Sequence, residues 1–91
     1  MDREEAQRRV STIWLPGAEI YFGCPAELDE SLTEEYAWGW VFYLVPSTPE
    51  ACKLDYKRCR IAYHRTTGRS IPVGTKGIEA ALYHIESVRQ Q

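Results

Sequence analysis

The sequence predicts an α+β fold: a three- to four-stranded antiparallel sheet with an N-terminal and a C-terminal amphipathic helix packed on one face. Two observations predict it. Apolar residues recur at helical spacing near both ends of the 91-residue chain, and they alternate with polar residues in its middle. Turn-forming Gly and Pro separate these segments. The length suits one domain, so we expect residues 1–91 to form a single unit.

The first predicted element is a helix. Asp2 and Glu5 have the spacing of a capping box, in which side chains satisfy the free amides of a helix start. The buried stripe of this helix is expected to be Ala6, Val10, Ile13 and Trp14. We expect Pro16-Gly17 to end the helix, because Pro lacks the amide hydrogen that an interior position donates.

A short strand is predicted over 18–23, with Ile20 and Phe22 on the same side. Residues 24–35 hold five carboxylates and few apolar side chains, so we expect an exposed loop with at most one helical turn. The strongest strand signal covers 36–45 and is apolar on both faces, which is typical of a central, covered strand. One face would carry Trp38, Trp40, Phe42 and Leu44, of which the last three are expected to point inward. Gly39 leaves room for another group to approach closely.

The second half predicts a short helical turn over 50–55 and then a strand over 56–65. In that strand Cys59, Ile61 and Tyr63 face one way, and Arg58, Arg60 and His64 the other. Residues 66–69 form a hairpin turn, and 70–73 an edge strand, because Pro72 lacks a ladder donor. The last helix is capped by Thr75, and its buried stripe is expected to be Ile78, Ala81, Leu82, Ile85 and Val88.

Charge is separated along the chain. The formal charge is −7 over residues 15–52 and +6 over 53–77, although the whole chain carries only −2. Fields of opposite sign favour selective contact with another macromolecule. This pattern indicates a binding protein.

No residue pattern indicates catalysis. The chain has no glycine-rich phosphate loop, no HExxH and no supported nucleophile–base pair. Cys24, Cys52, Cys59 and His64 lack the paired spacing of a zinc site, so we expect buried or partly buried thiols, no metal and no cofactor. His84 is expected to be an ordinary boundary histidine. We therefore expect a protein that is not an enzyme.

Location and membrane contact can also be predicted. No apolar run approaches the roughly 20 residues that span a bilayer, and the first five residues are too polar for a secretory signal. Three irregularly spaced cysteines argue against a disulfide framework. We expect a cytoplasmic protein with no membrane partner.

The second half of the chain resembles a known family. The resemblance rests on Gly39-Trp40-Val41-Phe42-Tyr43, on Arg65-Thr66-Thr67-Gly68 and on Val73-Gly74-Thr75 before the last helix. Together these segments, within residues 37–87, are similar to the YrhB-like family, small α+β domains grouped with the immunity proteins of bacterial polymorphic-toxin systems. The resemblance implies a cytoplasmic protein that binds and blocks a toxin, without cofactor or catalytic residues.

These observations lead to a hypothesis about the contact surface. The acidic stretch is expected to meet a basic toxin domain and to accelerate the encounter electrostatically. The predicted contact residues are the apolar anchors Tyr21 and Trp38 and the carboxylates Glu27, Asp29, Glu30, Glu34 and Glu35. A homodimer stays open as a further association.

Two other functions stay open. An accessory protein of a biosynthetic gene cluster would bind a peptide or small molecule on its sheet face, in an aromatic concavity around Trp38, Tyr43 and Tyr63. A nucleic-acid binder would use a basic face that includes Arg58, Arg60, Arg65 and Arg69. The overall pI of about 5.6 and the long acidic segment disfavour nucleic acid.

Overall fold

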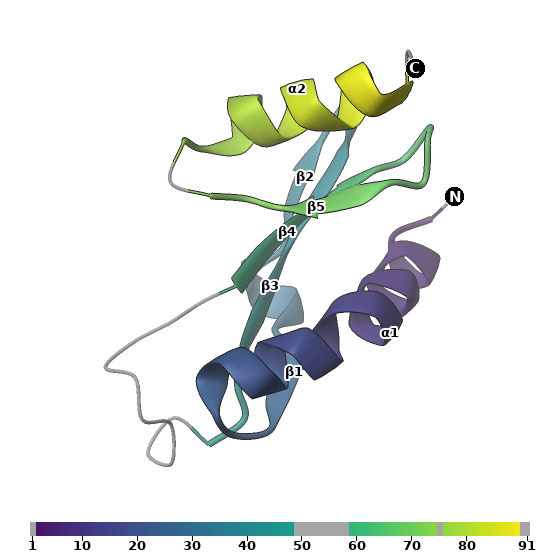
Figure 1. Ribbon diagram of the computed structural model, residues 1–91. Coiled ribbons are helices and arrows are strands. Elements are labelled where there is room, and N and C mark those ends of the chain that lie inside the picture. The colour runs from purple at the N-terminus through teal and green to yellow at the C-terminus, as the bar shows by residue number, and fades with distance from the viewer. Residues whose placement is uncertain (1, 49–58, 75, 90–91) are drawn as a thin grey trace.

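The computed structural model describes residues 2–48, 59–74 and 76–89, with the backbone alone for 87–89. The predicted α+β class is confirmed: a helix, an open antiparallel sheet and a second helix follow one another along the chain (Figure 1). The elements are α1 (Arg3–Phe22), β1 (Ala26–Leu28), the 3-10 turn η1 (Glu30–Leu32), β2 (Glu34–Tyr36), β3 (Gly39–Pro46), β4 (Cys59–His64), β5 (Ser70–Pro72) and α2 (Ile78–Arg89).

The sheet has five strands in four positions. β3 pairs with β4 and β4 with β5, while β1 and β2 both pair with the other side of β3. β1 lies opposite residues 44–46 of β3, and β2 lies opposite residues 39–41. The two short strands therefore act as one edge strand that η1 interrupts.

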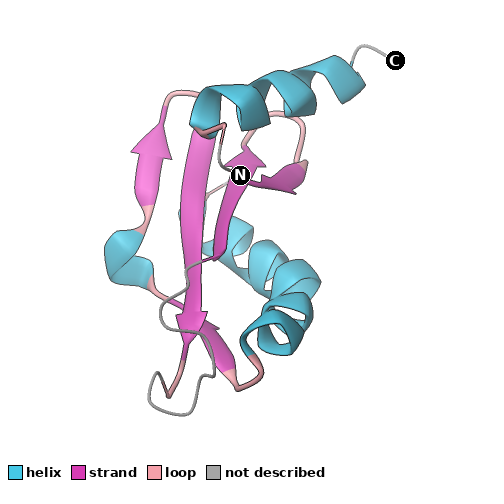
Figure 2. Cartoon of the chain, turned by 60° about the vertical axis from the view of Figure 1, so that its left-hand side comes forward, coloured by secondary structure: helices cyan, strands magenta, loops and turns pink. Residues whose placement is uncertain are grey.

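The two helices cover opposite faces of the sheet, so the prediction that both pack on one face is wrong (Figures 1 and 2). α1 packs on the row of Trp40, Phe42 and Leu44, which confirms the prediction that these residues point inward. α2 packs through Ala81 and Ile85 on the alternate row of Val41, Tyr43 and Ala62. Because β3 is apolar on both faces, each row needs a cover, and a single layer of helices could bury only one of them.

α1 does not end at Pro16-Gly17 but continues to Phe22, so the predicted strand over 18–23 is wrong. A proline inside a helix costs about 3 kcal/mol, and the last turns bring Ala18 and Phe22 into the core as compensation. Thr12 and Pro16 are exposed, so water can hydrate the Thr12 carbonyl that Pro16 leaves without a helical donor. One half of the predicted capping box forms: the Asp2 carboxylate accepts a hydrogen bond from the Glu5 amide at 2.8 Å. The Glu5 carboxylate instead pairs with Arg9 at 3.1 Å.

The predicted buried stripe of α1 also needs correction. Ala6 and Val10 are buried, but Ile13 is 59% exposed. The buried side chains follow one another every four residues as far as Phe22, and this row turns slowly around the helix as it crosses the sheet. Ile13 lies off that row.

The acidic segment 24–35 is part of the sheet and not a loop, although its expected helical turn exists as η1. Ala26 and Leu28 pack against the α1 side of the core, while Leu32 and Tyr36 pack on the α2 side. The strand predicted over 36–45 is split by a turn at residues 37–38 and begins again at Gly39. A Cβ on Gly39 would overlap the carbonyl oxygen of Tyr63, so the predicted close approach at this glycine is confirmed.

The hairpin predicted over 66–69 joins β4 to β5, and β5 pairs with β4 alone, as expected of an edge strand containing Pro72. The predicted turn over 50–55, residues 56–58 of the next strand, the Thr75 cap and the side chain of Val88 lie outside what the structure describes. Within the described ranges, neither helix combines the length and apolar character needed to traverse a bilayer.

Candidate functional site

The five predicted contact carboxylates lie along the interrupted edge strand formed by β1, η1 and β2, which we call the acidic edge. Its carboxylates are Glu27, Asp29, Glu30, Glu34 and Glu35. The chain places them here because alternate residues of β1 and β2 must enter the core, which leaves the acidic positions on the outside or at the rim. Glu27, Glu30 and Glu35 are exposed, whereas Asp29 and Glu34 are half-buried.

The two half-buried carboxylates have structural roles. Asp29 caps η1, because its Oδ1 accepts hydrogen bonds from the amide of Ser31 at 3.0 Å and from its hydroxyl at 2.6 Å. Glu34 accepts a hydrogen bond from the hydroxyl of Tyr36 at 3.2 Å. Partial burial of this hydroxyl, and secondly the nearby Glu34 carboxylate, raise the pKa of Tyr36 above its usual value. These two acids therefore hold the edge in place, and substituting them would break contacts within the chain.

Glu30 borders an open cleft of about 660 Å³ between α1 and the acidic edge. The Glu30 side chain accepts a hydrogen bond from Gln7 at 2.8 Å, and its backbone carbonyl accepts one from Arg3 at 2.9 Å. The cleft is lined by Glu4, Gln7, Arg8, Ser11, Leu28 and Glu30. Leu28 supplies the apolar part of this lining, beside the carboxylates of Glu4 and Glu30 and the guanidinium of Arg8. A lysine or arginine side chain of a partner can lay its apolar stem on Leu28 and direct its cationic head to the carboxylates.

Glu35 takes part in a network at the other end of the acidic edge. Its carboxylate lies 3.3 Å from the guanidinium of Arg65, which also donates a hydrogen bond to the Tyr36 carbonyl at 2.8 Å. The same guanidinium lies 4.5 Å from the ring centroid of Trp40, in a cation–π contact. Glu35 remains 62% exposed, so it still presents its charge to solvent.

Glu27 is the acidic-edge carboxylate for which the described residues supply no hydrogen bond or ion pair. Its residue is exposed and lies opposite Val45 in the register of β1 with β3. A substitution at Glu27 therefore changes surface charge without breaking a contact that the structure describes.

The two predicted apolar anchors do not lie together. Tyr21 is 57% exposed in the last turn of α1, near the end of β3 that pairs with β1. Trp38 directly precedes Gly39 at the other end of β3, and eight strand residues span roughly 25 Å. Its ring is half-buried between Tyr36, at a centroid distance of 5.2 Å, and His64, at 6.4 Å. Trp38 is thus a structural residue, and only Tyr21 remains available as an anchor.

His64 is also a structural residue, which corrects its prediction as part of an outward basic row. It is buried, and its Nδ1 accepts a hydrogen bond from the Thr67 amide at 3.3 Å, which holds the β4–β5 hairpin. Among the described residues, no cluster of three His, Cys, Asp or Glu could hold a metal ion. Cys52 lies outside those residues.

The surfaces required by the alternative functions do not form as predicted. Tyr63 packs on the α1 face of the sheet and Tyr43 on the α2 face, so they cannot line one concavity with Trp38. Two arginines of the proposed basic face also lie on different faces. Arg65 folds over Trp40 on the α1 face, whereas Arg60 lies across from Tyr43 on the α2 face. Arg58 lies outside the described residues.

Comparisons with protein-family models, with curated proteins and with solved structures find no match to this chain. The resemblance to the YrhB-like family therefore remains a prediction from the sequence, and function has to be argued from the surface.

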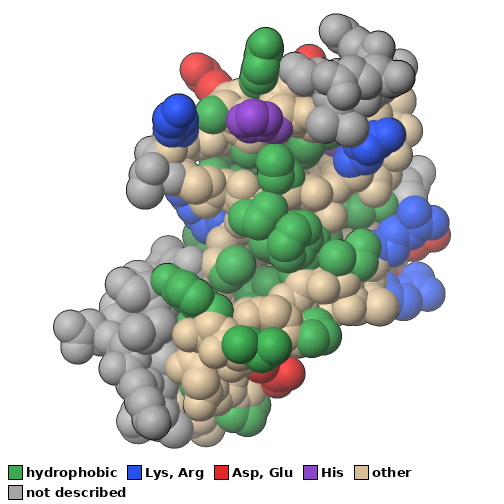
Figure 3. All heavy atoms as spheres, viewed as in Figure 1, with side chains coloured by type: hydrophobic (Ala, Val, Ile, Leu, Met, Phe, Trp, Pro, Cys, Tyr) green, Lys and Arg blue, Asp and Glu red, His purple; other side chains and the backbone are tan. Residues whose placement is uncertain are grey.

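The sequence analysis did not predict the exposure of two isoleucines on α1: it placed Ile13 in the buried stripe of the helix and Ile20 on one side of a strand. Ile20 is 84% exposed and Ile13 is 59% exposed. Figure 3 shows hydrophobic side chains at the surface over α1, with Lys and Arg side chains gathered towards its N-terminal end. The seven-residue spacing of the two isoleucines places them nearly in line on a helix. The sequence shows this only if the helix is known to continue through Pro16.

Proposed function

We propose that this chain is a binding protein that neutralises a cognate bacterial toxin, and that it meets the toxin through the acidic edge. The observation that carries the proposal is the cleft between α1 and the acidic edge, where Glu4, Glu30 and the apolar Leu28 line the wall together with Arg8. A lysine or arginine of a basic partner would lay its stem against Leu28 and place its charge between the carboxylates.

The exposed carboxylates Glu27 and Glu35 extend this negative surface along the edge of the sheet. Tyr21 adds an exposed aromatic ring near the turn from α1 to β1. Such a surface raises the association rate with a basic partner, because opposite charges steer the encounter. A second explanation for edge charges is protection from edge-to-edge aggregation, so the experiment must separate recognition from solubility.

The test is the association rate between the purified chain and the toxin domain encoded beside it, measured by stopped flow at several salt concentrations. The triple substitution Glu27→Gln, Glu30→Gln and Glu35→Gln removes three exposed charges but leaves the Asp29 cap and the Glu34–Tyr36 bond intact. We expect the association rate at low salt to fall about tenfold and its salt dependence to flatten.

The control is Glu86→Gln, which removes one exposed carboxylate from α2 and leaves the carboxylates of the acidic edge in place. It should leave the rate nearly unchanged. Equal rates for the triple variant and the unaltered chain would refute the acidic edge as the contact surface. A neighbouring cluster of tailoring enzymes in place of a toxin gene would instead favour the accessory function.

A further inference from the structure

A hollow lies between the edge strand β5 and helix α2. Its volume is about 250 Å³, and its apolar lining includes Ile71 and Pro72 of β5 and Gly77, Ala80 and Ala81 in and just before α2. These residues meet because α2 runs over β5 at this side of the sheet (Figure 1). The hollow is smaller than the roughly 300–1,000 Å³ of a small-molecule pocket. It suits a side chain of a larger partner.

The outer edge of β5 is open to another strand. Among the described residues, β5 pairs with β4 alone. The amide of Val73 and the carbonyl of Arg69 form hydrogen bonds with residues of β4. Because bonded positions alternate along an antiparallel strand, the amide of Ser70 and the carbonyls of Ser70 and Pro72 point away from β4. Three backbone groups are thus presented to an added strand.

Two contacts hold this edge in place before any partner binds. The Ser70 hydroxyl accepts a hydrogen bond from the indole of Trp14 at 2.8 Å, which ties β5 to α1. Ile71 packs with Ala81 on the other face of the sheet. Pro72 stands at an outward position, so its missing N–H costs β4 no bond but makes the free edge a poorer partner for strands in general. Side-chain contacts in the hollow must therefore select the occupant.

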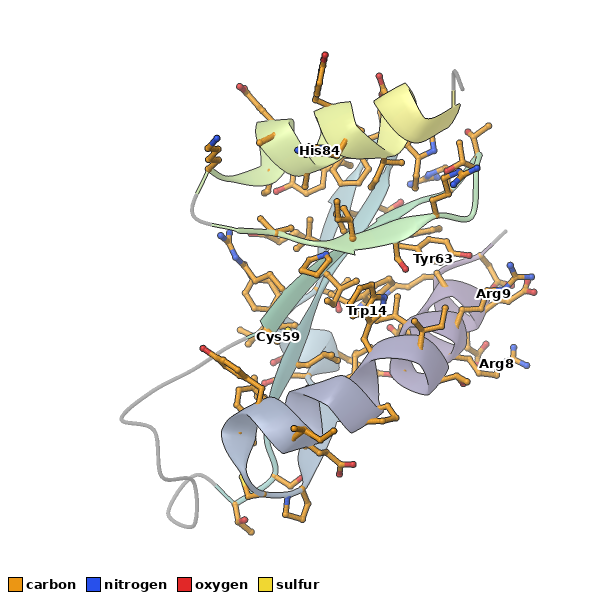
Figure 4. All side chains as sticks on the ribbon, in the orientation of Figure 1. Arg8, Arg9, Trp14, Cys59, Tyr63 and His84 are labelled. Atoms are coloured by element: carbon orange, nitrogen blue, oxygen red, sulfur yellow. The ribbon has the colours of Figure 1, made fainter. Side chains whose placement is uncertain are left out.

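The side chains around the hollow are basic. Lys76 and His84 belong to its lining and are exposed, and His84 lies on the stretch of α2 above β5 in Figure 4. Arg69 is exposed directly before β5. The two carboxylates on the described part of α2, Glu79 and Glu86, are not part of the lining. A partner that carries carboxylates beside an apolar side chain complements this surface.

We propose that the groove between β5 and α2 binds an extended acidic peptide segment of another protein, which adds to β5 as an antiparallel strand. Side chains alternate between the two faces of such a strand. One apolar side chain enters the hollow beside Ile71, and acidic side chains two positions before and after it lie near Lys76 and His84. The acidic edge is the opposite edge of the sheet, so this binding does not depend on the proposed toxin contact.

The test uses a synthetic peptide with this pattern, Thr-Glu-Thr-Leu-Thr-Glu-Thr, acetylated and amidated at its ends. It is titrated into the nitrogen-15-labelled full chain from about 10 μM to 1 mM, because a contact of this size is weak. We expect saturable chemical-shift changes at Ser70, Ile71 and Ala80. Hydrogen exchange of the Ser70 amide should also slow, because this amide bonds to the added strand.

Two control peptides separate backbone pairing from charge. N-methylation of the third and fifth residues removes the amides that bond the carbonyls of Ser70 and Pro72, and should weaken binding about tenfold. Replacing both glutamates by lysine sets like charges against Lys76 and His84, and should weaken binding by about as much. Equal affinity of the N-methylated peptide would overturn strand addition, and equal affinity of the lysine peptide would overturn the acidic partner.

Substitutions of Ala80 test the hollow itself. Ala80→Glu fills it with a carboxylate and should weaken binding of the acidic peptide at least about tenfold, whereas Ala80→Gln fills it without charge and should weaken binding less. Glu and Gln are good helix formers, so both variants should fold, and circular dichroism checks this. The control Ile20→Glu adds the same charge at a position on α1 that is 84% exposed, and should leave binding nearly unchanged.

Four results would overturn the proposal. The unaltered chain could show no saturable binding at 1 mM peptide, or Ala80→Glu could bind the peptide as tightly as the unaltered chain. A Ser70 amide that a second copy already protects without peptide would assign the edge to self-association. Tighter binding of a polyuridine oligonucleotide than of the peptide would assign the basic groove to nucleic acid.

Discussion

Replacing Phe22 and Ile20 separately by Ala tests whether α1 truly runs through Pro16. In a helix the two side chains lie on different faces, and in the structure Phe22 is 1% exposed while Ile20 is 84% exposed. In a strand over 18–23 they would share a face and be buried alike. The two substitutions therefore give different results for the two structures.

The expected magnitudes follow from the burial of each side chain. Phe22→Ala removes a fully buried ring and should lower the free energy of unfolding by about 3–5 kcal/mol. Ile20 has 100 − 84 = 16% of its surface covered. At roughly 1.5–3 kcal/mol for full burial, Ile20→Ala should cost about 0.2–0.5 kcal/mol. The better helix propensity of Ala offsets part of this loss.

The assay is urea unfolding followed by circular dichroism. A domain of this size has roughly 5–14 kcal/mol of stability in total, so Phe22→Ala should shift the midpoint strongly or leave the chain partly unfolded. Equal losses for the two variants would refute the continuous helix.

Three further predictions concern the network around the sheet. Gly39→Ala should destabilise the chain by about 3 kcal/mol or more, because its Cβ would overlap the Tyr63 carbonyl. Gly17→Ala, at an open helical position, should instead stabilise the chain by about 1 kcal/mol. Melting temperatures that shift in the same direction for both variants would contradict this pair of predictions. Arg65→Lys should cost about 1–2 kcal/mol, since Lys cannot bond the Tyr36 carbonyl and stack on Trp40 together, and unchanged urea unfolding would argue against the network. Tyr36 should ionise above its usual value near pH 10. The folded chain thus holds this proton more tightly than the unfolded chain, so its contribution to stability is complete below pH 10 and disappears as the pH rises through the folded pKa. In an absorbance titration, Tyr36→Phe should lack a tyrosine ionisation that the unaltered chain shows above pH 10. Loss of an ionisation at or below pH 10 would contradict the assignment to Tyr36.

The sequence analysis predicted elements correctly where a local signal and the tertiary packing agree. The alternation in β3 and β4 placed Trp40, Phe42 and Leu44 on the inner row, and Pro72 marked β5 as an edge strand. The Asp2 cap was also predicted correctly, because capping depends on residues three positions apart.

The errors arose where burial overrides a local signal. Pro16-Gly17 is a strong helix breaker in isolation, and only the contacts of Ala18 and Phe22 with the sheet explain why the helix continues. The acidic edge was predicted as a loop because its strands are three residues long, too short to show periodicity.

The site could be predicted only in part, because exposure and pairing depend on tertiary contacts. The sequence indicated which residues are acidic, but it could not show that Asp29 and Glu34 bond within the chain or that Trp38 lies between Tyr36 and His64. The exposed isoleucines of α1 were equally hidden, since their common face exists only in the continuous helix.

The most direct measurement of the proposed function is the activity of the neighbouring toxin domain as this chain is added in increasing molar ratio. We expect activity to vanish near equimolar ratio and to return when high salt separates the two proteins, with the masses of both unchanged. Full toxin activity in the presence of excess chain, or a covalent change in the mass of either protein, would contradict neutralisation by binding.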